Sequence, residues 1–292
     1  MNRRHFLRSS TAAALLAAPS RTLLALEADN TYRKNIGLQL YTLRKELGKD
    51  TPGTIKAVVD AGYKQGEMFG FPNCDKMIKA AKDSGLELHS SHFEWDSVVN
   101  PKDEGMSEFM KTLDKAKETG LSHLVIPYLM DKNRKTLDDY KKVAENCNKA
   151  AIKAKAAGIQ LAYHNHAFEF EPKEDGKTGF DVFTAEFSED MKFEVDVFWV
   201  KVGGVEPVDL MMKLKGRISQ LHLKDLMKGT KLPNYGSVPN EAFKELGNGM
   251  IPVEPIIDAA KDIGVAICHV EQDQSPDAIA SINQSIAHLK SL

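Results

Sequence analysis

Cysteine is scarce in this chain of 292 residues: Cys74, Cys147 and Cys268 lie far apart and form no CxxC pair. This spacing gives no sign of a redox or metal-binding motif, and we interpret all three as ordinary buried thiols. An excess of one charge is also lacking, because 39 basic residues stand against 41 acidic ones and the formal net charge is −2. This balance argues against a nucleic-acid partner, which would require a strongly basic surface.

A long hydrophobic run is missing as well, even near the N-terminus. Arg3 and Arg4 precede a short stretch of small apolar residues at 12–18. A charged start followed by such a stretch is the pattern of a secretory signal, and paired arginines resemble the twin-arginine type, which exports folded proteins. The stretch is too short to span a membrane as a helix. We therefore expect residues 1–28 to be an export signal and leader, and the mature protein to be periplasmic and free of the membrane.

Beyond residue 34 the chain repeats one pattern: a short β-prone run, a turn, an amphipathic helical stretch and usually a glycine. The helical stretches stop at Gly62, Gly85, Gly120, Gly158 and Gly264, and glycine readily takes the left-handed conformation in which helices end. The pattern yields eight β-prone runs, at residues 36–41, 64–69, 86–92, 123–127, 159–165, 193–197, 218–223 and 266–271.

Strict alternation of strands and helices predicts a parallel sheet, and eight such units predict a closed (β/α)8 barrel, or TIM barrel. The alternative is an open doubly wound sheet, which usually carries a glycine-rich phosphate loop after its first strand. Residues 41–44 read Tyr-Thr-Leu-Arg instead. No linker divides the chain, so we expect residues 29–292 to form a single TIM-barrel domain. The longest irregular stretch, 227–249, would be a loop at the active mouth and a partial lid.

Polar residues gather at the ends of the predicted strands: Glu67, His89, His92, His164, Asn165, His166, Glu169, Asp196, His222, Lys224, Asp225, His269, Glu271 and Asp273. The C-terminal strand ends of such a barrel share one mouth, and side chains two residues apart on a strand point the same way. His164 can therefore face inward with His166. Burying so many acids and imidazoles together is costly without a counter-charge, which a divalent cation supplies.

Several runs of the sequence resemble one family: GLQLYTLR at 37–44, YHNHAFEF at 163–170, EVDVFW at 194–199, LHLKD at 221–225, ELGNG at 245–249 and HVEQD at 269–273. These runs are similar to those of the sugar phosphate isomerase/epimerase family, whose barrels are xylose isomerase-like and which includes ketose 3-epimerases and inosose dehydratases. The resemblance extends from about residue 35 to residue 292.

The resemblance implies one divalent metal ion per chain, held by His164, Asp196, His222 and Glu271. In that family the ion is often manganese, cobalt, magnesium or zinc, and mixed nitrogen and oxygen ligands suit manganese, cobalt, zinc or iron better than calcium. Sugar epimerases of the family carry a glutamate where this chain has His164. They use it with the strand-eight glutamate as a pair of acid/bases, so this departure puts symmetric epimerisation in doubt. The histidine form resembles the inosose-dehydratase branch.

A metal ion holding a carbonyl and an adjacent hydroxyl polarises the carbonyl and stabilises an enediolate. A base must then remove the neighbouring proton, and Glu271, His166 and Glu169 are the candidates. Lys224 could neutralise an oxyanion, although a solvated lysine is an equal alternative. Five further residues are candidates for binding a polyol, each with core packing as the alternative: Gln39, Tyr41, Glu67 and His92 for hydroxyl groups, and Trp199 for stacking on a sugar face.

We therefore expect a metal-dependent isomerase or epimerase that acts on a sugar or keto-sugar. The alternative with the same site is a lyase that expels a β-hydroxyl or a glycosyl group. Export favours unphosphorylated substrates. A barrel endonuclease for abasic DNA would need three metals and a basic groove, and a mere sugar-binding barrel would not need a complete ligand set. The sequence leaves the oligomeric state open, a homo-oligomer included.

Overall fold

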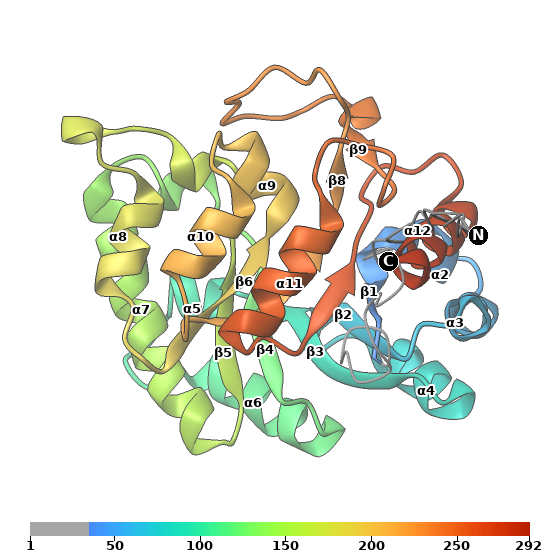
Figure 1. The fold of residues 1–292 in the computed structure, drawn as a ribbon. Helices are drawn as coiled ribbons and strands as arrows, with labels where there is room; N and C mark the ends of the chain where they lie inside the picture. The colour runs from blue at the N-terminus through green and yellow to red at the C-terminus, as the bar shows by residue number, and fades with distance from the viewer. Residues whose placement is uncertain (1–34) are drawn as a thin grey trace, which may run out of the picture.

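The structure is a computed structural model that describes residues 35–292; the expected signal at 1–28, with Arg3 and Arg4, lies outside these residues. Eight parallel strands close into a barrel in the order β1-β10-β7-β6-β5-β4-β3-β2 (Figure 1). They are β1 (Gly37–Gln39), β2 (Gln65–Phe71), β3 (Glu87–Phe93), β4 (His123–Ile126), β5 (Gln160–His164), β6 (Met191–Asp196), β7 (Ile218–Leu223) and β10 (Cys268–Val270). Every strand coincides with one of the β-prone runs, so the predicted (β/α)8 barrel is confirmed.

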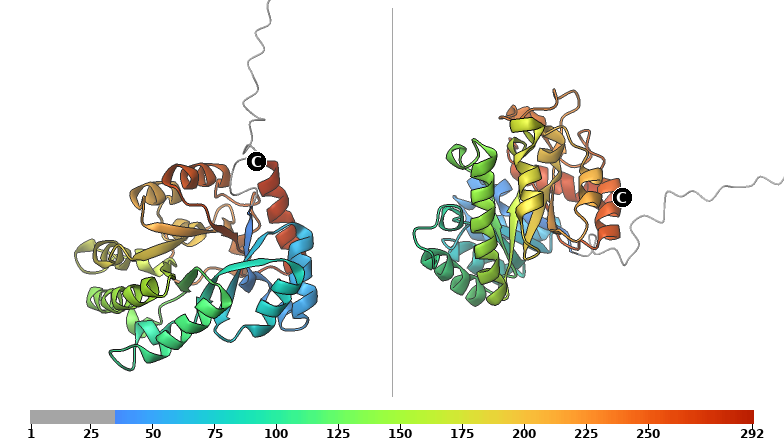
Figure 2. Two further views of the ribbon diagram at one scale, coloured as in Figure 1. Left: turned by 90° about the horizontal axis from the view of Figure 1, so that it is seen from below. Right: turned by 90° about the vertical axis from the view of Figure 1, so that its left-hand side faces the viewer.

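One long helix follows each barrel strand, and these helices surround the barrel, as the view from below in Figure 2 shows. They are α3 (Thr51–Ala61), α4 (Asp75–Ser84), α6 (Ser107–Thr119), α7 (Leu137–Ala156), α8 (Gly179–Glu186), α10 (Pro207–Lys213), α11 (Val253–Ile263) and α12 (Ala278–Ser291). The helices α3 and α11 end as expected, at Gly62 and Gly264, whose φ angles of 106° and 80° are left-handed. Among the described residues, no helix is both long and apolar enough to cross a bilayer.

The interior of the barrel is polar. Glu194 and Gln220 are fully buried, and Gln220 donates a hydrogen bond to Glu67 on β2, a strand that is not a neighbour of β7. This contact therefore crosses the inside of the barrel. Because side chains alternate along a strand, the apolar neighbours Val195 and Leu221 lie on the outer face, under the helices. The apolar core thus lies mainly between the barrel and the helices, and polar side chains occupy the interior of the barrel.

The segment 227–249, expected to be irregular, contains more structure than predicted. Near its end lies β9 (Phe243–Lys244), which pairs with β8 (Asp225–Leu226). The two strands form a small antiparallel sheet, seen toward the top of Figure 1. The buried Asp225 carboxylate accepts hydrogen bonds from the backbone N–H groups of Gly247, Gly249 and Ile251. A side chain at position 249 would collide with Asp225, which explains the second glycine of the ELGNG run. The segment is thereby anchored beside the barrel mouth.

Candidate metal centre and its cavity

Four side chains from consecutive strand ends meet at the C-terminal mouth of the barrel: His164 of β5, Asp196 of β6, His222 of β7 and Glu271 directly after β10. His164 Nε2 lies 3.2 Å from His222 Nδ1 and 3.3 Å from Asp196 Oδ2. His222 Nδ1 lies 2.9 Å from Glu271 Oε2 and 3.9 Å from Asp196 Oδ2. One ion at about 2.0–2.2 Å from each donor fits such separations.

Local structure fixes two of these side chains. Asp196 ends β6 and caps the short helix α9 (Val197–Val202), because its Oδ1 accepts a hydrogen bond from Trp199 N at 3.0 Å. Its other oxygen is left to face His164. The Asn165 side chain, which points away from the centre, exchanges hydrogen bonds with the backbone N–H and C=O of Asp196. Asn165 therefore ties the end of β5 to the end of β6 and sets the separation of the two ligands.

The chemistry of the donor set fits a dication. Burial raises the pKa of Asp196, but Lys224 and His164 outweigh burial and hold it well below its usual range. Burial likewise opposes the charge of Glu271, and Lys224 and His222 hold its pKa well below normal. Both carboxylates are therefore ionised and supply the two negative charges that balance a divalent ion. Within residues 35–292, the buried Asp196 Oδ2 accepts no hydrogen bond of good geometry, although Lys224 Nζ lies 3.0 Å and His164 Nε2 3.3 Å away.

Lys224 is 1% exposed and lies against the same carboxylates. Its Nζ is 2.8 Å from Glu271 Oε2, 3.0 Å from Asp196 Oδ2 and 2.9 Å from Asp273 Oδ2. Burial disfavours the ammonium, yet Asp196, Asp273 and Glu271 raise the pKa of Lys224 well above normal. Lys224 is thus a charged group of the centre. The alternative of a solvated lysine is wrong.

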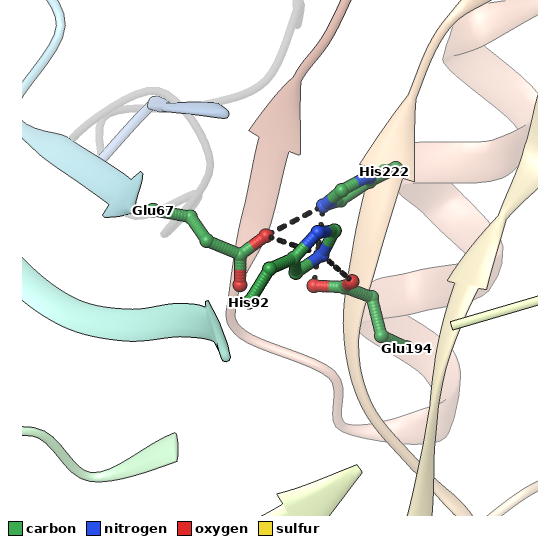
Figure 3. A group of neighbouring side chains, drawn as sticks. All are labelled: Glu67, His92, Glu194 and His222. Carbon is green, nitrogen blue, oxygen red and sulfur yellow. Dashed lines mark hydrogen bonds and ion pairs between the residues drawn. The ribbon is translucent and has the colours of Figure 1, made fainter. Parts of the chain in front are cut away.

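A second group of acids and imidazoles shares His222 with the four ligands and lies deeper in the barrel, because its Glu194 precedes Asp196 by two residues on β6. Figure 3 shows its side chains turned toward one another. His222 Nε2 lies 2.7 Å from Glu67 Oε1 and 3.2 Å from Glu194 Oε1, and His92 Nε2 lies 2.9 Å from Glu194 Oε2. An ion on Nδ1 of His222 would leave the Nε2 proton to be donated to Glu67. A carboxylate in this position fixes the tautomer and the ring orientation of a metal-binding histidine.

Neutral donors complete this lower layer. Glu67 accepts hydrogen bonds from Gln39 Nε2 at 2.7 Å, from Ser90 Oγ, and from Gln220 Nε2 at 2.7 Å. Gln39 and Glu67 were predicted to bind substrate hydroxyls, but both are fully buried and neither lines the cavity above. For Glu67 the reason is that β2 continues to Phe71, so that Glu67 lies four residues below the strand end rather than at the mouth. Gln39 ends β1, but its amide group is engaged by Glu67 and by Tyr41 N.

A cavity of about 580 Å³ opens above the centre. Its floor includes His164, Lys224 and Glu271, and its walls are rich in aromatic rings. Of the predicted substrate-binding residues, Tyr41, His92 and Trp199 line it. Three residues of the segment before β9 and one residue of β9 itself close one side: Ser237, Val238, Asn240 and Phe243. The expectation that 227–249 borders the mouth therefore agrees with the geometry.

The predicted base candidates differ in their access to the cavity. His166 lines the cavity, with its ring 5.1 Å from that of Trp199 and stacked on Phe168, and its Nδ1 has no hydrogen-bond partner among the described residues. Burial and the nearby His164 lower the pKa of His166 well below normal, so the ring is neutral. Glu169 does not line the cavity: it accepts hydrogen bonds from Tyr163 OH and from His166 N. Glu169 is therefore placed to hold the His166 backbone, not to reach a substrate.

Sequence reasoning did not select Glu194 and Asp273 as site residues. Glu194 lies two residues before Asp196, and Asp273 two residues after Glu271, so the same alternation that paired His164 with His166 would have found them. Asp273 lines the cavity beside Lys224, and burial together with the Glu271 charge raises its pKa to about 7.

Comparison with known proteins defines the class. Residues 55–292 match the family described as xylose isomerase-like TIM barrel, and the chain belongs to this family. An inosose dehydratase of Lacticaseibacillus casei is 25% identical over 265 residues, which cover 78% of this chain and 85% of the relative.

Solved structures agree with this assignment. A sugar phosphate isomerase/epimerase from Parabacteroides distasonis superposes with a TM-score of 0.73 at 26% identity, over 88% of this chain and 98% of that one. The IOLI protein, crystallised with a zinc atom, has a TM-score of 0.61 at 16% identity, over 88% of this chain and 95% of that one. The family is one of sugar-processing enzymes, and the relatives include both isomerases or epimerases and dehydratases.

Proposed function

We propose that this protein is a metal-dependent enzyme that removes a proton from the carbon next to the carbonyl of an unphosphorylated sugar or keto-sugar, and acts as an isomerase or epimerase. The observation that carries the proposal is the convergence of two imidazoles and two ionised carboxylates, His164, Asp196, His222 and Glu271, of which His164 and Glu271 line a cavity. Similarity to a sugar phosphate isomerase/epimerase supports the reaction class.

The lining of the cavity supports an unphosphorylated substrate. Among the described residues that line it, Lys224 is the only lysine or arginine, and its ammonium is already surrounded by Asp196, Glu271 and Asp273. A phosphate group bound in proteins usually contacts free arginine or lysine side chains, or a helix N-terminus. The expected export of the protein leads to the same substrate class.

A divalent ion bound by the four ligands would act as a Lewis acid on the substrate carbonyl and would stabilise the enediolate. The protein's own residues orient the metal ligands, bind the substrate and stabilise its developing charge. Lys224 places a fixed positive charge at the cavity floor, where negative charge develops on substrate oxygen. Glu67 holds His222 in one orientation through the contact of 2.7 Å. Trp199 and Tyr41 offer ring faces to the apolar side of a sugar.

His166 is our first candidate for the base. Its ring is neutral at neutral pH and borders the cavity, and its Nδ1 has no partner within the described part of the chain. Its depressed pKa makes it a weaker base than an ordinary histidine, so it accepts a proton only from carbon that the ion has already acidified. Glu271 is the second candidate. A carboxylate that binds a dication is held in its charged form and is correspondingly less basic.

A lyase is the second candidate function, and two observations favour it. His164 stands where the sugar epimerases of the family have a glutamate, and Asp273 carries a pKa of about 7 beside the cavity, so that it can donate a proton to a departing hydroxyl or glycosyl oxygen. The inosose dehydratase relatives add to this reading.

Proton NMR in heavy water tests the proposal. Protein loaded with Mn²⁺, Co²⁺ or Zn²⁺ is incubated with a panel of keto-sugars, and NMR follows the hydrogen next to the carbonyl. We expect solvent deuterium to replace this hydrogen, with Asp196→Ala as the inactive control. The product then distinguishes an isomerase or epimerase, which conserves the formula, from a lyase, which releases water or an alcohol. Metal-loaded protein that exchanges no substrate hydrogen would refute the proposal.

A further inference from the structure

A second hollow adjoins the metal cavity at its outer side. It encloses about 690 Å³, and the two hollows share Glu94, Trp95 and Tyr128 as lining residues. Met130 lines only the second hollow, together with the charged residues Asp96, Asp131 and Lys132. The shared residues form the border between the two, so a ligand can extend from the metal centre across Trp95 and Tyr128 without leaving the protein surface.

Large apolar side chains are left exposed in both hollows. Met130, in the second hollow, is 49% exposed, and Tyr41, which lines only the metal cavity, is 40% exposed. Trp95 and Tyr128 are half-buried and pack on the apolar core. Such side chains on the rim of a cavity usually mark a binding site, because a ligand that covers them removes apolar area from water.

The Tyr128 ring and the Trp95 backbone at the border are held in place before any ligand arrives. Arg134 donates from Nη2 to Tyr128 OH at 3.3 Å and from Nε to Leu129 O at 3.0 Å. The Tyr128 ring meets His166 edge to face at 5.0 Å. Trp95 is the N-cap residue of the short helix α5 (Asp96–Val99), and its backbone is fixed because its carbonyl accepts hydrogen bonds from Val98 N and Val99 N. A fixed ring loses little conformational freedom on binding, which favours affinity.

The metal ligands and the border rings differ in which hollow they line. His164, Glu271 and Lys224 line only the metal cavity, whereas Trp95 and Tyr128 line both hollows. Cavities of about 300–1,000 Å³ enclose ligands of drug size, and one six-carbon sugar is much smaller than that. A single sugar with its hydroxyl groups at the floor would leave the aromatic border uncovered.

We propose that Trp95, Tyr128 and Met130 form an outer subsite, which binds a second ring joined to the sugar at the metal centre, so that the substrates are glycosides. The second ring has an apolar face and is either another pyranose or an aromatic group. This inference rests on the proposed function for the identity of the first ring. The outer subsite gives the substrate binding energy away from the reacting carbon, which enzymes use to orient the reacting end.

The two tryptophans of the chain allow a direct test, because Trp95 borders the outer subsite and Trp199 lies near the metal ligands. Trp199→Phe leaves Trp95 as the single fluorescent reporter, and Trp95→Phe leaves Trp199. Three probes are titrated into the Zn²⁺-loaded proteins: methyl β-glucopyranoside with one ring, and phenyl β-glucopyranoside and methyl β-cellobioside with two. We expect the one-ring probe to change only the emission of Trp199, and at least one two-ring probe to change both.

Affinity provides a second readout. Trp95→Ala should weaken binding of the responding two-ring probe about 10-fold, and Trp95→Phe, which keeps a ring, should weaken it much less. Because Met130 is exposed, the variant Met130→Ala should fold normally. It should weaken binding of the same probe by a smaller factor. Met110→Ala, which removes another exposed methionine, on α6 and outside both hollows, is its matched control and should change nothing.

Three results would overturn the outer subsite: no response of Trp95 to either two-ring probe, equal loss of affinity for one-ring and two-ring probes in Trp95→Ala, or equal effects of Met130→Ala and Met110→Ala. These measurements detect binding, not turnover. A failure of the proposed function would appear instead as absent deuterium exchange, with the response of Trp95 to two-ring probes unchanged.

Discussion

Glu67→Gln tests how the lower layer supports the metal centre. Glu67 Oε1 lies 2.7 Å from His222 Nε2, and both side chains are fully buried. With an ion on Nδ1, the Nε2 proton of His222 is donated to this carboxylate, which makes the imidazole a stronger ligand. A glutamine of the same shape removes the charge, and its amide N–H groups conflict with the donors Gln39 and Gln220, which both point at this position.

The expected loss of metal affinity depends on the groups that still support His222 in this variant. Loss of such a supporting carboxylate typically weakens metal binding about 10- to 100-fold, or roughly 1.4–2.7 kcal/mol. Glu194 Oε1 lies 3.2 Å from the same His222 nitrogen and can accept its proton instead. We therefore expect Glu67→Gln to fall near the lower limit, at about 10-fold weaker binding.

Competition for Zn²⁺ between the apoprotein and a coloured chelator measures this affinity. Glu169→Gln is the matched control, because Glu169 is an equally buried carboxylate that contacts Tyr163 and the His166 backbone but none of the four ligands. Asp196→Ala, which removes a ligand, should lose about 100-fold or more. An affinity of Glu67→Gln equal to that of the wild type, in protein with wild-type thermal stability, would refute the supporting role of Glu67.

Three further predictions concern the base, a buried carboxyl group and export. His166→Asn should keep the metal but lose about 100-fold or more in deuterium exchange, since general-base catalysis contributes roughly 10²–10⁴; full activity would leave Glu271 as the base. Burial raises the pKa of Glu169 from 4.5 to about 7, so the folded state keeps a proton that the unfolded chain releases. The free energy of unfolding should therefore fall as pH rises from about 4.5 to 7, and Glu169→Gln should flatten this slope in urea unfolding; identical slopes would contradict the assignment. Replacing Arg3 and Arg4 with lysine should keep the protein inside the cell in fractionation experiments, and unchanged export would exclude a twin-arginine signal.

The meeting of all strand ends at one mouth explains why the four metal-ligand candidates could be predicted together. His164 and Asp196 end their strands, His222 lies one residue before the end of β7, and Glu271 directly follows β10. The resemblance to a family then selected these four among the many polar strand ends.

The depth at which a side chain lies inside the barrel could not be predicted in the same way. The end of β2 was expected at residue 69, and the structure extends it to Phe71 with a register shift beside Glu67, so that this carboxylate supports His222 from below. Pairing of β8 with β9 was not predicted either. It depends on the Asp225 carboxylate binding backbone N–H groups more than twenty residues further on, a contact for which the local sequence gives no signal.

Anomalous diffraction from crystals grown with Mn²⁺, Co²⁺ or Zn²⁺ tests the central claim most directly. We predict one strong peak per chain at about 2.0–2.3 Å from His164 Nε2, Asp196 Oδ2, His222 Nδ1 and Glu271 Oε2. A peak bound by other residues, or no peak in crystals of folded protein grown with an excess of the metal, would contradict the metal centre and the reaction proposed for it.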